Sequence, residues 1–213
     1  MPGPSVCPDI SREPGFPLYK SPPPRYDNFQ DCRYNAAGSR RPSGKETAMQ
    51  NLTVTSPAFQ DGGWIPLDNS ARGSDLSPEL RLQGISERAV SLAVTMDDAD
   101  HPIFSNFNHW ILWNLPVREV IPAALPAGSP VPGLPGAVQG VAYGKNRYKG
   151  PKPPLKAIHT YRFTVYVLDC RLSLPPSARR KDFLPAIEGH VLQKATLCGK
   201  FQSRRQGINR SDK

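Results

Sequence analysis

The 213-residue chain contains only four cysteines, and their spacing matches no common metal site. Cys7, Cys32, Cys170 and Cys198 form no C-x-x-C pair of the kind that is typical of structural zinc sites. Cys170 and Cys198 lie in apolar, strand-like stretches, where a buried and reduced thiol is the expected state. The sequence therefore predicts neither a bound metal nor another cofactor.

Long apolar runs are also missing from the chain. No segment approaches the roughly 20 apolar residues that a membrane-spanning helix needs. The first residues lack the apolar stretch behind a basic start that is typical of a secretory signal. The sequence therefore predicts a cytoplasmic protein without integral membrane insertion, while peripheral contact with lipid headgroups stays open.

Acidic residues are outnumbered, with 18 Asp and Glu against 27 Lys and Arg, for a net charge of +9. Five of the basic residues fall within a short stretch that contains no acid: Lys145, Arg147, Lys149, Lys152 and Lys156. Such a cluster favours an anionic ligand or partner, although a solvated loop is the alternative. No helix-turn-helix, zinc-finger or aromatic-stacking motif accompanies the charge, so nucleic-acid binding is not expected.

Proline content divides the chain into three parts. Residues 1–48 hold nine of the 25 prolines and show no sustained apolar periodicity, which predicts a disordered or loosely packed extension. Residues 49–202 carry the apolar segments of one packed domain. Residues 203–213 are basic and are expected to form a solvated tail.

The domain is rich in segments with the period of two that is typical of strands. Because no helix alternates with these segments, the predicted fold class is mainly β, built around a large antiparallel sheet. One or two short helices are expected, one of them ending at Gly189. The Pro- and Gly-rich stretch 121–154 is predicted to be a long functional or disordered connection. The principal strands are expected at 51–59, 89–96, 107–115, 158–170 and 191–201.

Alternation along 158–170 places His159 and Tyr161 at the start of the more apolar face of that strand. Burying these polar groups without partners costs roughly 1–3 kcal/mol each, so a structural partner or a ligand must satisfy them. On the strand 89–96, the apolar face continues to Asp98. Three polar side chains therefore lie at the ends of apolar faces.

The strand 107–115 contributes a fourth polar group. Alternation groups His109 with Ile111, Trp113 and Leu115. If this strand pairs antiparallel with 89–96, the end of one meets the start of the other, and His109 reaches the same sheet edge as Asp98.

The four groups would form a small pocket with an apolar floor and a polar rim, suited to an anion. The carboxylate either orients a histidine tautomer or is protonated and donates a hydrogen bond. The alternative is that each of these residues forms its hydrogen bonds with neighbouring protein groups at its own strand end, without a ligand.

Seven segments occur in an order and spacing that resemble a known family. They are SPAFQDGGWIP, DLSPEL, SLAVTMDDADHP, NHWILWNLP, VQGVAYGKNRYKGPKPP, HTYRFTVYVLD and AIEGHVLQKATLCGKF. Together they cover roughly residues 52–202 and resemble the phosphatidylethanolamine-binding protein family, particularly its bacterial Raf-kinase-inhibitor-like branch.

The resemblance implies a β-sandwich-like fold with a small anion pocket and no enzymatic activity. It implies ligands such as phosphate, carboxylate or phosphoethanolamine-type anions, and a kinase or other protein as a possible partner of a monomer or homodimer. The ligand-contacting residues that it implies are Asp98, His109, His159 and Tyr161, with Pro153 and Pro154 beside them. The residues that it implies as shaping the pocket are Asp100, Pro102, Trp110 and Gly150.

The chain departs from the family pattern at several positions near this pocket. Ala99 and His101 replace a proline and a small residue, and Thr160 replaces the usual arginine. Asp100 is therefore expected to lack its usual ion pair. A cis peptide bond before Pro102 is expected from the resemblance.

An enzymatic function is the alternative reading of the same residues. A small metal-independent hydrolase would use His109 or His159 as its base and Asp98 to orient that base. No Ser or Cys falls on the pocket-facing strand ends, however, and no G-x-S-x-G motif occurs. The sequence therefore favours binding over catalysis.

Overall fold

The computed structural model describes residues 51–104 and 106–203. The predicted extension 1–48 lies outside the described residues, as does all of the predicted tail 203–213 except its first residue. In the described part of the chain, no helix is long and apolar enough to cross a membrane. The cytoplasmic location stays a prediction.

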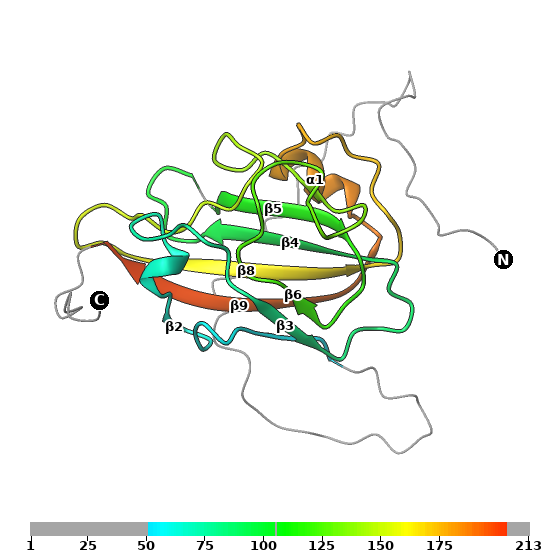
Figure 1. Cartoon of the computed structure of the whole chain (residues 1–213), viewed down its shortest axis with the longest axis horizontal. Coiled ribbons are helices and arrows are strands. Elements are labelled where there is room, and N and C mark those ends of the chain that lie inside the picture. The colour runs from blue at the N-terminus through cyan, green and yellow to red at the C-terminus, as the bar shows by residue number, and fades with distance from the viewer. Residues whose placement is uncertain (1–50, 105, 204–213) are drawn as a thin grey trace, which may run out of the picture.

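A six-stranded sheet forms the centre of the fold (Figure 1). Its neighbouring strands are antiparallel except at one edge, where β2 and β9 run parallel. The sheet is therefore mainly antiparallel, as predicted, with one parallel pair of strands at that edge. In spatial order, its strands are β2 (Gly63–Trp64), β9 (Val191–Gln202), β8 (Ile158–Leu168), β4 (Ser91–Asp98), β5 (Phe107–Leu115) and β7 (Val138–Gln139).

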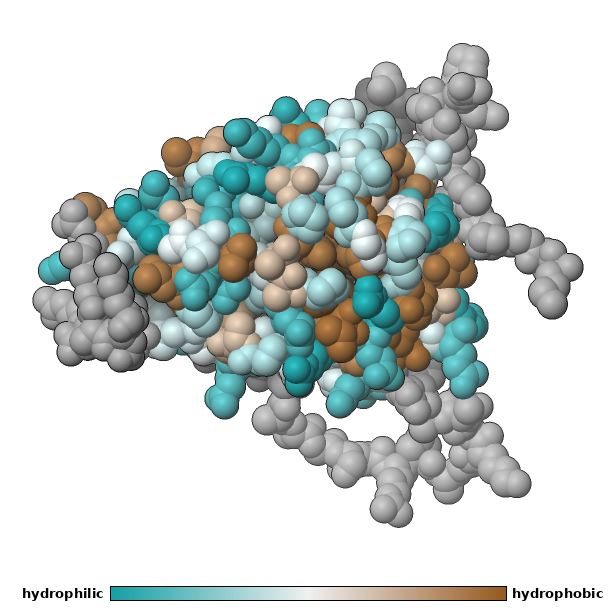
Figure 2. Space-filling model, viewed as in Figure 1, coloured by the Kyte–Doolittle hydropathy of each residue, from teal (hydrophilic) through white to brown (hydrophobic). Residues whose placement is uncertain are grey.

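A smaller antiparallel sheet packs against one face of the central sheet. Its order is β1 (Thr53–Thr55), β3 (Leu80–Gln83) and β6 (Val120–Ile121), and a short 3-10 helix η1 (Leu67–Asn69) precedes β3. The apolar side chains of both sheets form one core cluster between them. On the face seen in Figure 2, apolar residues gather over this small sheet, whose Val120 is exposed.

The opposite face of the central sheet is covered by the helix α1 (Arg180–Ala186). Phe183 of this helix is fully buried and contacts the rings of Trp113 and Tyr166. A second apolar cluster therefore lies on this side of the sheet. The two clusters make the central strands apolar on both faces, which explains their continuous burial.

The mainly β fold class is confirmed, and the strand at 107–115 has the predicted bounds. The strand predicted at 89–96 begins at Ser91 and extends to Asp98, so the carboxylate belongs to the strand itself. The stretch 121–154 is not a plain connection, because it contains β7 and packs its Gln139 side chain fully inside. The two- to four-residue strands β2, β3, β6 and β7 are too short to show a period in the sequence.

The oxidation state of the two described cysteines differs from the prediction. Cys170 and Cys198 are buried, as expected from their apolar neighbours, but both are disulfide-bonded. The predicted reduced state is therefore wrong, since local sequence indicates burial and carries no information on the oxidation state. Disulfides persist mainly in oxidising compartments, so the cysteines give no support to a cytoplasmic location.

Candidate functional site

The site is built at the end of the central sheet where β4 finishes and β8 begins. Asp98 is the last residue of β4, and it lies directly opposite Tyr161 of β8 in the antiparallel register. Directly opposed residues point to the same face, so both side chains enter the space at the end of the main core. Asp98 and Tyr161 are buried, with only 2% and 1% of their surfaces exposed.

The Asp98 carboxylate is the centre of the polar contacts. Its Oδ2 lies 2.7 Å from Nδ1 of His159, and its Oδ1 accepts the backbone N–H of Asp100 at 3.0 Å. The Tyr161 hydroxyl forms a further hydrogen bond with the same carboxylate. Three donors thus converge on one acceptor, which favours the predicted role of orienting a histidine tautomer over the role of a donor.

Tyr161 is held as a neutral phenol. Burial raises the pKa of its hydroxyl well above the usual value, and the neighbouring Asp98 carboxylate raises it further. The hydroxyl therefore keeps its proton and donates a hydrogen bond to Asp98, while the backbone of Lys152 forms a hydrogen bond with the phenol oxygen.

His109 reaches the site through a β-bulge, and its predicted grouping with Ile111 and Trp113 is wrong. Met96 of β4 faces Trp110, but the next residue Asp97 faces Asn108, so His109 has no partner on β4. The extra residue reverses the alternation of β5 at this point. A second register shift between Leu92 and Val94 sets Leu115 on the main-core face, while Ile111 and Trp113 join the cluster beneath α1.

The bulge turns the His109 ring toward Tyr161. The two ring centroids lie 5.3 Å apart with nearly perpendicular planes, and 5% of His109 is exposed. Without the extra residue, His109 would follow Ile111 onto the other face of the sheet.

The side chain of Asn108 stabilises this bulge. Its Nδ2 lies 3.2 Å from the carbonyl oxygen of Met96 and 2.9 Å from that of Trp110, so it bridges the two backbone groups on either side of the extra residue. The same Nδ2 lies 2.9 Å from Oδ1 of Asp97. A bulge disrupts the regular ladder, and the Asn108 amide offers a donor to both carbonyls at this point.

Both histidines are held through Nδ1, so each leaves its Nε2 for a ligand. Nδ1 of His109 donates to the carbonyl oxygen of Lys149 at 2.8 Å, as Nδ1 of His159 donates to Asp98. Neither Nε2 forms a hydrogen bond within the described residues, and neither is a buried unsatisfied atom. Burial lowers the pKa of His109, which leaves its Nε2 lone pair available at neutral pH.

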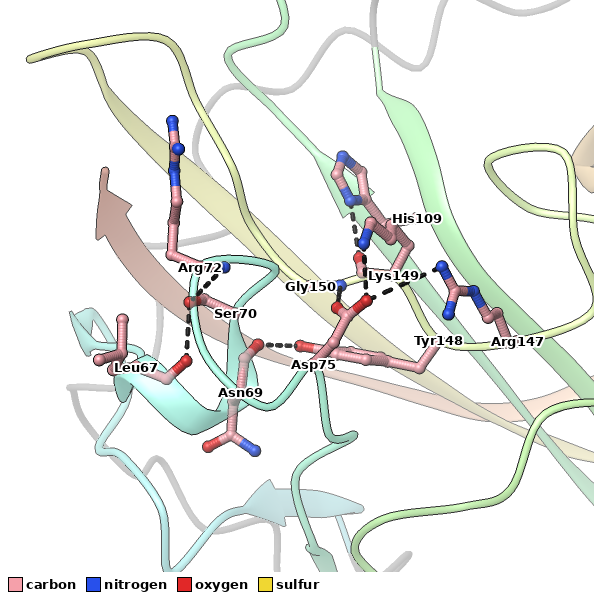
Figure 3. A network of polar contacts seen from close by, with 10 residues as sticks. All are labelled: Leu67, Asn69, Ser70, Arg72, Asp75, His109, Arg147, Tyr148, Lys149 and Gly150. Atoms are coloured by element: carbon pink, nitrogen blue, oxygen red, sulfur yellow. Dashed lines mark hydrogen bonds and ion pairs between the residues drawn. The ribbon is translucent and has the colours of Figure 1, made fainter. Parts of the chain in front are cut away.

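The loop segment 147–150, which carries the acceptor for His109, is held by Asp75 from a distant loop (Figure 3). The Asp75 carboxylate accepts hydrogen bonds from the Lys149 ammonium at 2.6 Å and from the Gly150 backbone N–H at 2.7 Å. The guanidinium of Arg147 lies 4.0 Å from the same carboxylate. The hydroxyl of Tyr148 donates to the carbonyl oxygen of Asn69 at 2.6 Å. This network fixes the backbone that orients His109.

Gly150 is required by the close approach of two backbones. A Cβ atom at this position would lie 2.6 Å from the carbonyl oxygen of Asn69 and 2.7 Å from Cα of Ser70. Pro153 is buried and Pro154 is exposed in the loop that follows. The carbonyl oxygen of Pro153 accepts the Ser203 hydroxyl.

The other predicted pocket residues lie around this centre. Asp100 Oδ2 accepts the backbone N–H of Thr160 at 2.7 Å, so the residue that replaces the family's arginine supplies a hydrogen bond through its backbone. The peptide bond before Pro102 is trans, and the expected cis bond is wrong: among the described residues, only Ser129–Pro130 is cis. Trp110 is a core residue whose Nε1 donates to Gln139 at 2.9 Å.

The basic cluster is partly neutralised by contacts that the local sequence does not reveal. Lys149 and Arg147 share Asp75, which lies about seventy residues earlier in the chain. Within the described part of the chain, Lys145, Lys152 and Lys156 are exposed and form no ion pair. The free positive charge beside the site is therefore smaller than the sequence indicates.

Sequence reasoning missed Asp75 and Asn108, which support the site without lining it. Asp97 was missed as well: its Oδ1 lies 3.0 Å from Nε of Arg180 in α1, on the opposite face of the sheet from Asp98. The adjacent pair Asp97–Asp98 in a buried strand was the available signal, because alternation sends two such carboxylates to opposite faces.

The described residues thus form a two-sheet β fold with a buried carboxylate, two imidazoles and a phenol at one end of the central sheet. The chain belongs to the phosphatidylethanolamine-binding protein family, whose sequence model matches residues 55–202. It is similar to a UPF0098 protein of Pyrococcus abyssi, with 38% identity over 157 residues that cover 73% of this chain and 88% of the relative.

Solved structures show the same fold. A phosphatidylethanolamine-binding protein homologue from Chlamydia trachomatis is 30% identical, with a TM-score of 0.65 over 73% of this chain and 99% of the other. YbcL of Escherichia coli is 23% identical, with a TM-score of 0.65 over 72% of this chain and 99% of the other.

Proposed function

We propose that the protein binds a phosphate- or carboxylate-type anion, such as the phosphate of a phosphoethanolamine headgroup, between His109 and His159. We propose further that it is a non-enzymatic binding protein whose occupancy regulates a protein partner such as a kinase. The family membership and the site geometry support the first part, and the family resemblance alone supports the second.

The observation that carries the proposal is the shared state of the two imidazoles. Both Nδ1 atoms are occupied by fixed acceptors, so both Nε2 atoms are left for a ligand. A phosphate that carries one proton can donate its hydroxyl to a neutral Nε2, and an imidazole that takes up a proton can donate to a phosphate oxygen. Both exchanges suit a weakly acidic oxyanion.

The polar contacts around Asp98 support binding over turnover. Its partners are an imidazole, a phenol and a backbone amide, and none of these is an activated nucleophile. The Tyr161 hydroxyl has a raised pKa and is committed to the carboxylate. A hydrolase would need a nucleophile from another source.

Isothermal titration calorimetry with inorganic phosphate and with phosphoethanolamine tests the proposal. Both ligands are expected to release or absorb heat with the wild type, and His159→Ala is expected to abolish that heat. His190→Ala is the matched control, because His190 also pairs with a carboxylate, at 2.9 Å from Asp169, but lies at the other end of the sheet.

The outcomes are distinct. No heat with the wild type at millimolar ligand, or unchanged heat in His159→Ala, contradicts anion binding at this site. Turnover in a broad phosphoester and ester screen that His109→Ala abolishes contradicts the non-enzymatic part.

A further inference from the structure

A row of aromatic rings leads from the site to the protein surface. His109, whose ring contacts Tyr161 within the site, also contacts Tyr143 at a centroid distance of 5.2 Å and Phe107 at 5.6 Å. Phe107 and Tyr143 contact each other at 5.3 Å with perpendicular planes. These two rings therefore form a corner directly beside the imidazole that offers its Nε2.

The row continues outward through His101 and Phe104. The His101 ring stacks on Phe107 at 4.7 Å with planes 18° apart, and on Phe104 at 5.4 Å with planes 27° apart. Nδ1 of His101 accepts the backbone N–H of Ile103 at 3.3 Å and of Phe104 at 3.1 Å, which fixes the orientation of the imidazole. We call His101, Phe104, Phe107 and Tyr143 the aromatic rim.

The rim is unusual because two of its rings are exposed, while His101 and Phe107 are half-buried. Phe104 is 56% exposed and Tyr143 is 55% exposed, whereas the largest aromatic side chains of the two cores are almost fully buried. Exposed apolar surface beside a polar site is typical of a surface that a ligand covers. None of the four side chains carries a carboxylate or an ammonium group, so the surface that they offer to a ligand consists mainly of aromatic rings.

We propose that the rim binds a planar ring that is attached to the anion, so that the ligand is a small soluble ring-bearing anion, such as the phosphate monoester of a phenol. This inference rests on the proposed function. The anion occupies the two Nε2 atoms, and the ring continues the stack of His101 and Phe107 or enters the corner between Phe107 and Tyr143. The nearly parallel and perpendicular ring planes are the two arrangements that aromatic pairs favour.

Calorimetry with three probes tests the rim: inorganic phosphate, phenyl phosphate and cyclohexyl phosphate. Phenyl phosphate is expected to bind about tenfold more tightly than the other two, since aromatic contacts add to the burial of apolar area. Phe104→Ala and Tyr143→Ala are expected to remove this gain and to leave the affinity for inorganic phosphate unchanged. Val191→Ala, an exposed apolar residue at the far end of β9, is expected to change neither affinity.

Equal affinities for inorganic phosphate and phenyl phosphate overturn the rim proposal and leave the anion site in place. Cyclohexyl phosphate binding as tightly as phenyl phosphate overturns the selection for a planar ring. A failure of all three probes to bind overturns both this inference and the proposed function.

Discussion

Nδ1 of His159 and Oδ2 of Asp98 lie 2.7 Å apart, although 61 residues separate them in the chain. Both side chains are buried, so the carboxylate fixes which ring nitrogen of His159 carries a proton inside the protein. This contact, together with the bond from His109 to Lys149, leaves the Nε2 atoms of both rings available to a ligand.

Asp98→Asn is expected to destabilise the fold and weaken phosphate binding. The amide NH₂ cannot accept from His159 or Tyr161, and a buried unsatisfied donor costs about 1–3 kcal/mol in free energy of unfolding. Urea unfolding and phosphate titration measure the two effects. Asp100→Asn is the control, since its amide oxygen still accepts the Thr160 N–H, and a variant as damaging as Asp98→Asn would contradict the central role of Asp98.

The stability of the protein is expected to fall as the pH drops below about 6.5, the usual pKa of histidine. Burial lowers the pKa of His109 in the folded state, so the unfolded chain binds a proton first and gains stability relative to the fold. The loss continues until the pH passes the lowered pKa of the folded protein. Urea unfolding between pH 7.5 and pH 5.5 measures it.

His109→Asn is the matched variant for this pH dependence, because its Nδ2 takes the position of Nδ1 and can still donate to the Lys149 carbonyl, while the amide does not titrate. Its stability is expected to vary less over the same pH range. An identical pH dependence in both proteins would exclude His109 as its source.

Asn108→Asp is expected to release His109 from the site. The new carboxylate cannot donate to the carbonyls of Met96 and Trp110, and it lies beside Asp97. We expect a loss of about 1–3 kcal/mol in free energy of unfolding, and phosphate binding weakened at least about tenfold. Thermal or urea unfolding and calorimetry check the two parts.

Asn114→Asp is the control for a structural effect. Asn114 belongs to the same strand and its Nδ2 donates to the carbonyl oxygen of Leu172 at 2.9 Å, far from His109. Its substitution is expected to lower stability and to leave phosphate affinity unchanged. Equal losses of affinity in both variants would show that Asn108 has no specific effect on His109.

Asp75→Asn is expected to loosen the segment 147–150 (Figure 3). Asn tolerates the left-handed backbone conformation of Asp75, whose φ is 58°, so the change removes the charge without straining the loop. Hydrogen exchange at Gly150 is expected to accelerate, and phosphate affinity to fall several-fold. Glu79→Gln, which breaks the exposed ion pair with Arg81, should change neither quantity.

The sequence was sufficient to place three of the four site residues. The register between β4 and β8 runs without a shift, so a period of two brings Asp98 and Tyr161 opposite each other, with His159 two residues away. His109 could not be placed correctly in this way, because the bulge between Asn108 and Trp110 depends on contacts with β4.

The contacts that hold the site residues in place could not be predicted from local sequence either. Asp75 neutralises Lys149 across 74 residues, and the basic stretch contains no acid that would reveal this contact. The role of Asn108 depends on two carbonyls that lie beside the register shift between β4 and β5. Both are consequences of tertiary structure, whereas the alternation of apolar residues is local.

The most direct test of the account is an NMR titration of the imidazole nitrogens with inorganic phosphate. The account predicts that the Nε2 resonances of His109 and His159 move toward their protonated positions and saturate together, while those of His190 stay unchanged. Resonances of His109 and His159 that do not move at millimolar phosphate, or that move only as much as those of His190, would contradict it.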